Sequence, residues 1–135
     1  IYSEFGKNFL KTIIKIATKK REINIVNDQF GSPTNANDLA VAILKVINNK
    51  NFRTKNFSSE TYHFSNTGTT SWHLFAKEIF KLKRIKCKIN QIKSVETNSL
   101  ASRPKNTSLN INKIVTNFKI KPNTWKKSLK NFFIE

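Results

Sequence analysis

Gln29 and Phe30 open a polar turn with side chains suited to binding a ligand. An apolar, β-branched run precedes this turn and predicts a half-buried strand near 23–27. A helix follows, and Asn37 or Asp38 could cap it. A strand, a tight turn and a capped helix place polar groups at the rim of a sheet, where α/β proteins usually bind ligands. A plain turn with no ligand explains the same spacing.

Two further positions suit an anion. Asn8 precedes an amphipathic helix, whose free N–H groups favour phosphate, although simple capping by the Asn8 side chain explains the same pattern. Arg103 stands before Pro104 in a polar loop, and a guanidinium can fork two hydrogen bonds onto phosphate oxygens. Only 4 of the 25 cationic residues are arginine, which makes this one noteworthy. A surface ion pair with Glu96 is the alternative.

The histidines and the cysteine indicate no catalytic or metal site. Neither His63 nor His73 has a cysteine or carboxylate at a metal-ligand spacing, so both are interpreted as structural. The single Cys87 cannot form an internal disulfide, which is typical of a reducing, cytoplasmic compartment. No apolar run approaches the ~20 residues that would span a bilayer, so no membrane partner is expected.

A net charge of +17 raises a second function class, a small basic nucleic-acid-binding protein. The charge comes from 21 lysines dispersed along the chain, the weaker pattern for a nucleic-acid patch. Trp72 and Trp125 stand on apolar helical stripes, whereas a base-stacking platform needs exposed aromatic rings among cations. We therefore expect no specific nucleic-acid partner.

The periodicity predicts an α/β fold within one domain, residues 1–135. The second helix should bury a stripe of five apolar residues, and residues 50–60 should form a surface loop. Serine and threonine at 69–71 should cap the third helix. Residues 88–92 alternate like a further strand. The expected helices are 7–20, 37–48, 71–83, 111–118 and 123–132, the strands are 23–27 and 61–65, and the stripe is Leu39, Ala40, Ile43, Leu44 and Ile47.

Four blocks of the sequence together resemble the C-terminal half of the dTDP-4-dehydrorhamnose reductases, a family of extended short-chain dehydrogenases/reductases. Their order and separations fit over nearly the whole chain, which contains no methionine and is expected to be a piece of a longer protein. The blocks are Tyr2 to Phe9; Asn27 to Thr34 with Asp38-Leu39-Ala40; Tyr62-His63-Phe64 with Thr70-Ser71-Trp72 and Phe75-Ala76; and Ser102-Arg103-Pro104 with Asn106, Ser108 and Leu109.

The resemblance implies a Rossmann-type cofactor domain in the first half of such a protein and a smaller sugar-nucleotide-binding subdomain, mainly this chain. It implies NAD(P)H-dependent reduction of dTDP-4-dehydro-L-rhamnose to dTDP-L-rhamnose for cell-surface polysaccharide. The family's Gly-rich cofactor fingerprint is absent here, and so is its Tyr-x-x-x-Lys pair, because Gly6 and Asn66 stand four residues after Tyr2 and Tyr62. No catalytic residue is therefore assigned to this chain, which alone should be inactive.

By the same resemblance, five residues should bind the substrate. Asn8 should lie near the nucleotide, Gln29 and Phe30 near the sugar or base, and Arg103 near the diphosphate, with Asn106 in the same block. The family sometimes uses Mg²⁺ in assembly, although no carboxylate cluster here demands it, and a homodimer is compatible with the resemblance. The choice between NADH and NADPH stays open, as does a related epimerase or an inactive regulatory subunit.

Overall fold

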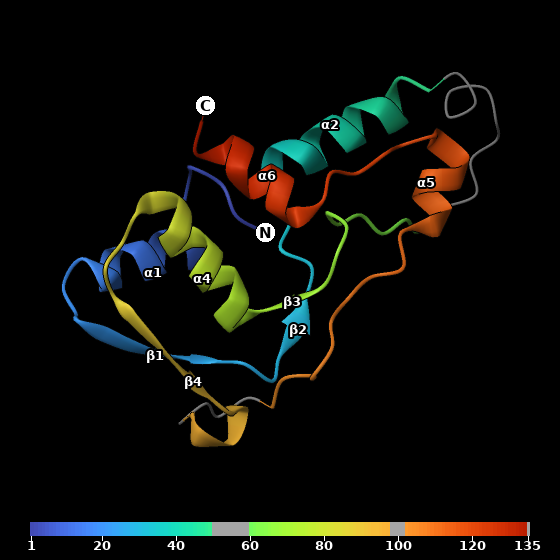
Figure 1. Cartoon of the computed structure of the whole chain (residues 1–135). Helices are drawn as coiled ribbons and strands as arrows, with labels where there is room; N and C mark the ends of the chain where they lie inside the picture. The colour runs from blue at the N-terminus through green and yellow to red at the C-terminus, as the bar shows by residue number, and fades with distance from the viewer. Residues whose placement is uncertain (50–59, 98–101, 135) are drawn as a thin grey trace.

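The computed structural model describes residues 1–49, 60–97 and 102–134, and its mixture of helices and parallel strands confirms the α/β class (Figure 1). The helices are α1 (Phe9–Ala17), α2 (Ala36–Ile47), α4 (Trp72–Lys83), α5 (Asn112–Phe118) and α6 (Trp125–Phe132), with a short 3-10 helix η1 (Ser94–Glu96). The strands are β1 (Glu22–Val26), β2 (Phe30–Gly31), β3 (Thr70–Ser71) and β4 (Lys88–Ile92).

The central pairing joins β1 to β4 in parallel, from Glu22 opposite Lys88 to Val26 opposite Ile92. Ile23 and Ile25 belong to the main core, where β1 contacts α1 and α4. Within the described ranges β1 pairs with β4 alone, so the other edge of β1 is open. That edge borders the candidate site.

Helix α1 is shorter than predicted, because its last predicted residues, Lys19 and Lys20, lie beyond the cap at Thr18. Its first turn is capped by Asn8, whose side-chain oxygen accepts a hydrogen bond from the Lys11 amide at 3.1 Å. The capping interpretation of Asn8 is therefore confirmed. Ser71 likewise caps α4 by accepting from the Leu74 amide, as the sequence predicts.

The predicted cap of α2 is wrong. Asn35 accepts the hydrogen bond of the Asn37 amide at 2.9 Å, because an N-cap needs extended backbone and residue 37 is already helical. The Asp38 carboxylate instead accepts hydrogen bonds from Asn66 and Ser128. These contacts tie α2 to α6 through a largely buried polar network.

The predicted buried stripe of α2 is also wrong. Ile43, Leu44 and Ile47 are 49%, 57% and 44% exposed, whereas Ala42 is 2% exposed and belongs to a second core cluster with Val46. The helix carries apolar residues on both sides, and periodicity cannot decide which side the rest of the chain covers.

The strand predicted over 61–65 is wrong as well, because these residues take part in no strand ladder among the described residues. Tyr62 and Phe64 do pack in the second cluster, so their β propensity reflects a half-buried environment. Strands β2 and β3 were not predicted, since two residues are too few for a periodic signal. The strand over 88–92 is confirmed as β4, and the predicted 50–60 loop lies outside the described residues except for Glu60.

A carboxylate fastens the carboxyl ends of β1 and β4. Asp28 accepts hydrogen bonds from the Ser94 amide at 2.9 Å and from the Ser94 hydroxyl at 2.6 Å. These bonds, the side-chain one first, lower the pKa of the Asp28 carboxyl. The link fixes η1 beside the turn after β1.

The buried face of α4 should carry much of the stability of the fold. We expect Ile79→Ala to lower the free energy of unfolding by about 2–5 kcal/mol, because Ile79 is fully buried and its truncation leaves a cavity. The matched control is Leu74→Ala on the same helix, where the side chain is 48% exposed, with an expected cost below about 1 kcal/mol. Urea unfolding measures both, and equal losses would contradict this core assignment.

The Asp28–Ser94 link should make stability depend on pH. The pKa of the Asp28 carboxyl is lower in the folded state than its ordinary value of 3.8. The hydrogen bonds to Ser94 therefore contribute their full stabilisation above pH 3.8, and this stabilisation is lost as the pH falls through the folded-state pKa. The difference in unfolding free energy between wild type and Asp28→Asn should therefore be constant at neutral pH and shrink in acid. Urea unfolding between about pH 3 and pH 7 measures it. A difference that persists unchanged into acid would contradict the link.

Candidate functional site

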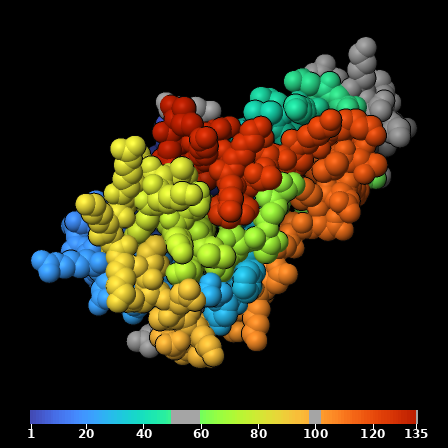
Figure 2. Space-filling view, viewed as in Figure 1, coloured from blue at the N-terminus to red at the C-terminus, as the bar shows by residue number. Residues whose placement is uncertain are grey.

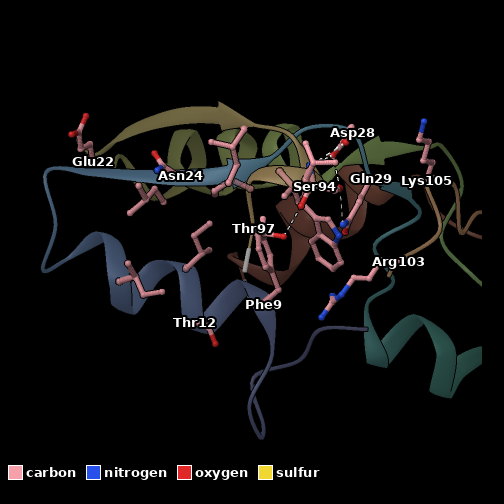
Figure 3. A pocket seen from close by; sticks show the side chains of 18 of the residues that line it. Phe9, Thr12, Glu22, Asn24, Asp28, Gln29, Ser94, Thr97, Arg103 and Lys105 are labelled. Atoms are coloured by element: carbon pink, nitrogen blue, oxygen red, sulfur yellow. Dashed lines mark hydrogen bonds between the residues drawn. The ribbon is translucent and has the colours of Figure 1, made fainter. Parts of the chain in front are cut away.

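A cavity of about 1250 Å³ lies along the open edge of β1 (Figure 3). Helix α1 forms one wall through Phe9 and Ile16, and the segments around η1 and 102–105 form another. The rings of Phe9 and Trp72 pack with their centroids 4.6 Å apart beside it. The cavity therefore combines apolar, aromatic and polar walls.

Three cations line the cavity, Lys20, Arg103 and Lys105, and none of them forms an ion pair with a carboxylate among the described residues. Among the described residues, ion pairs join Lys88 to Glu22 and Lys113 to Glu60, and Arg103 takes part in neither. The predicted alternative, a pair between Arg103 and Glu96, is not present; Glu96 accepts a hydrogen bond from the Lys93 amide instead. In Figure 3 the Arg103 side chain extends toward α1. A guanidinium placed in this way can receive an anionic ligand.

Gln29 and Arg103 are the predicted site residues that the structure brings into this cavity. The Gln29 side-chain amide donates a hydrogen bond to the Ser94 hydroxyl at 2.9 Å, and that hydroxyl in turn donates to Asp28. Three side chains from two segments thus hold one another at the cavity wall. This arrangement orients the Gln29 amide toward the cavity.

Phe30 lines a neighbouring hollow of about 300 Å³ that Gln29 and Trp72 also border. The Phe30 ring is 42% exposed, and its backbone holds the Arg103 loop in place. The Phe30 amide donates to the Lys105 carbonyl at 2.8 Å, and the Thr107 amide donates to the Phe30 carbonyl at 2.9 Å. Gly31 is needed beside this contact, because a Cβ there would lie 2.7 Å from the Thr107 hydroxyl.

Asn8 and Asn106 line neither the cavity nor the neighbouring hollow. Asn8 uses its oxygen to cap α1 and donates from its nitrogen to the Ser3 carbonyl at 2.8 Å. The Asn106 oxygen accepts from the Ser108 amide at 3.0 Å. In the structure as described, both amides support the local backbone.

Sequence reasoning missed three contributors to the site. Ser94 follows β4 with no motif around it, and Asp28 stands in the turn without an assigned role. Trp72 was interpreted as an ordinary core residue, yet it lines both hollows. Only the fold brings these positions together, since Asp28 and Ser94 are 66 residues apart in the chain.

The described residues contain no group of three or more histidine, cysteine, aspartate or glutamate side chains that could hold a metal ion. His73 is buried, and burial followed by the charge of Lys77 lowers the pKa of its imidazole. His63 lies at neither hollow. No helix among the described residues has the length and apolar character to cross a membrane.

Comparison with known proteins places the chain in a family. A family model described as "RmlD substrate binding domain" matches residues 1–135. The dTDP-4-dehydrorhamnose reductase of Sinorhizobium fredii is 31% identical over 132 residues, which cover 95% of this chain and 45% of that protein. The chain thus spans less than half the length of this relative.

Solved structures agree in fold and sequence. The dTDP-4-dehydrorhamnose reductase of Bacillus anthracis, in complex with NADP, superposes with a TM-score of 0.84 at 37% identity, covering 98% of this chain and 44% of that one. The corresponding enzyme of Clostridium acetobutylicum gives a TM-score of 0.86 at 35% identity, with coverage of 98% and 45%. The chain therefore belongs to the family of RmlD substrate-binding domains.

Proposed function

We propose that this chain is the substrate-binding part of an NAD(P)H-dependent reductase that converts dTDP-4-dehydro-L-rhamnose to dTDP-L-rhamnose for cell-surface polysaccharide. The observation that carries the proposal is Arg103, a guanidinium at the cavity with no carboxylate partner among the described residues. The name of the Sinorhizobium relative supports the choice of substrate.

The charges at the cavity favour a diphosphate. Arg103 and Lys105 line it together, and a guanidinium binds two phosphate oxygens at once. Of the two carboxylates that line the cavity, Glu22 pairs with Lys88 and Asp28 is hydrogen-bonded to Ser94. In this arrangement Arg103 receives the diphosphate and Lys105 adds positive charge nearby.

The remaining walls suit the other parts of a dTDP-sugar. A thymine needs a flat apolar surface and a hydrogen-bonding partner, and Phe9, Trp72 and the Gln29 amide provide both. Phe30, in the adjoining hollow, is assigned to the sugar or base. Asn8 and Asn106 are proposed to act indirectly, by holding the start of α1 and the Arg103 loop.

The proton donor of the reaction must come from outside this chain. Tyr2 is 2% exposed, and burial together with the nearby charge of Asp38 raises the pKa of its phenol. The Tyr62 hydroxyl donates to Glu60 at 2.6 Å. Neither tyrosine has the lysine four residues on that the family pattern requires.

The cofactor also belongs outside this chain, which lacks the Gly-rich fingerprint. A bound nicotinamide would supply hydride, while the residues described above bind and orient the substrate. Four expectations from the sequence stay predictions: the choice between NADH and NADPH, a homodimer, Mg²⁺ in assembly and a cytoplasmic location.

The nucleic-acid alternative gains no support from the aromatic residues. Trp125 is 6% exposed within the main core, and Trp72 packs against Phe9. Rings held in this way offer no stacking platform for bases.

Arg103 should contribute directly to nucleotide affinity in the full-length protein. A partly desolvated guanidinium–phosphate contact contributes about 1.5–3 kcal/mol, so Arg103→Ala should weaken dTDP binding about ten- to hundredfold. Arg103→Lys should recover only part of the loss, because an ammonium cannot fork onto two oxygens. Arg84→Ala, at an exposed arginine that lines neither hollow, is the matched control. Calorimetric titration with dTDP measures all three, and unchanged affinity in Arg103→Ala would refute the assignment.

The 135-residue chain alone should not reduce the 4-keto sugar nucleotide with either NADH or NADPH. The reason is the missing cofactor fingerprint and the missing Tyr-x-x-x-Lys pair. Absorbance of the reduced nicotinamide, followed in the presence of substrate, measures the activity. Turnover above a no-protein control would contradict the proposal that the cofactor site and the proton donor lie outside this chain.

A further inference from the structure

The orientation of the Gln29 side-chain amide decides which ligand groups it can bind. Rotation of a terminal amide exchanges its acceptor oxygen and its donor nitrogen, so neighbouring hydrogen bonds must choose between the two. Gln29 lies at the cavity wall, where its nitrogen donates to the Ser94 hydroxyl at 2.9 Å (Figure 3). Its oxygen accepts no hydrogen bond among the described residues. The choice therefore depends on whether Ser94 can accept or donate.

Asp28 fixes the hydrogen of the Ser94 hydroxyl. The Ser94 oxygen lies 2.6 Å from one Asp28 oxygen, and the Ser94 amide nitrogen lies 2.9 and 3.1 Å from the two Asp28 oxygens. These bonds lower the pKa of the Asp28 carboxyl, the hydroxyl bond most, so the carboxylate is ionised at neutral pH and can only accept. The single hydrogen of the hydroxyl is thereby used. Toward Gln29, the Ser94 oxygen can only accept.

This chain of bonds forces the nitrogen of the Gln29 amide toward Ser94. With the amide reversed, two oxygens would face each other with no hydrogen between them. The Gln29 oxygen is thus presented to a ligand as an acceptor, and the amide retains a second N–H beside it. An acceptor next to a donor is complementary to the N3–H and a carbonyl of thymine or uracil. It opposes cytosine, because N3 of cytosine is itself an acceptor.

The surroundings of Gln29 suit a nucleobase that is attached to a diphosphate. The turn after β1 lies between the segment after β4 and the segment 102–109, at the lower edge of the molecule in Figure 2. Trp72 lines the same two hollows as Gln29, and its ring packs against Phe9 as a flat apolar wall. Arg103 lines the same cavity. One ligand can therefore place its base at Gln29 and its diphosphate at the guanidinium.

We propose that Asp28 and Ser94 are positioning residues that hold the Gln29 amide with its oxygen toward the nucleobase, and that they thereby select pyrimidines with an N3–H, thymine and uracil, over cytosine. The inference rests on the proposed function, which supplies a dTDP-sugar as the ligand, and it assigns the selectivity for the base to three side chains of this chain.

Calorimetric titration of the full-length protein with dUDP and dCDP tests the proposal. The two nucleotides share the sugar and the diphosphate and differ only in the hydrogen-bonding edge of the base. We define the selectivity as the Kd for dCDP divided by the Kd for dUDP, and we expect a value of about ten or more in the wild type. Ser94→Ala frees the amide to turn, so the selectivity should fall to within about threefold of one, partly through tighter binding of dCDP. Ser94→Thr keeps the hydroxyl and should retain the wild-type selectivity.

Ser128→Ala is the matched control. Ser128 makes the same kind of link, because it donates to Asp38 and accepts from the Asn66 side-chain amide at 3.0 Å, but it lines neither hollow. Its removal should leave the selectivity unchanged even where it lowers the melting temperature. The control therefore separates the orientation of the Gln29 amide from a general loosening of the fold.

Equal affinity of the wild type for dUDP and dCDP would overturn the proposal, and so would wild-type selectivity in Ser94→Ala. A loss of selectivity in Ser128→Ala as large as that in Ser94→Ala would also overturn it, because the effect would then not depend on the hydroxyl beside Gln29. An absence of dTDP binding by the wild type would instead refute the proposed function, and this inference with it.

Discussion

The parallel pairing of β1 with β4 is the constraint on which the other elements depend. Two parallel strands cannot be joined by a tight turn, so the chain between them must cross over. The crossover includes β2, α2, β3 and α4. The return places Ser94 beside Asp28, and their hydrogen bonds fasten the two strand ends. The edge of β1 that faces away from β4 then borders the cavity.

The polar groups around this edge divide into those already satisfied and those available to a ligand. Asn8 caps a helix, Asn106 closes a turn, and Asp28 binds Ser94. Arg103 has no carboxylate partner within the described ranges. Because a satisfied group contributes little to a ligand, this division is the reason why we propose the guanidinium as the group that binds an anion.

A second polar network holds the opposite end of the molecule. Asn66 is fully buried and donates to Asp38 at 2.6 Å, while its oxygen accepts from the Asn35 amide at 2.8 Å. A partly buried carboxylate is tolerated because Ser128 and Asn123 also donate to it. The network fixes the first turn of α2 to α6 through Asp38 and Ser128.

The sequence by itself determined the α/β class, the helices, β1, β4 and two members of the cavity lining, Gln29 and Arg103. These follow from local rules: apolar periodicity, capping residues and the distinct chemistry of arginine and glutamine. Tertiary structure alone decided which side of α2 is buried, since both sides are apolar, and whether residues 61–65 find a strand partner. It also brought Asp28 to Ser94, 66 residues away. Each of these outcomes depends on groups distant in the chain, and spacing within one segment carries no information about them.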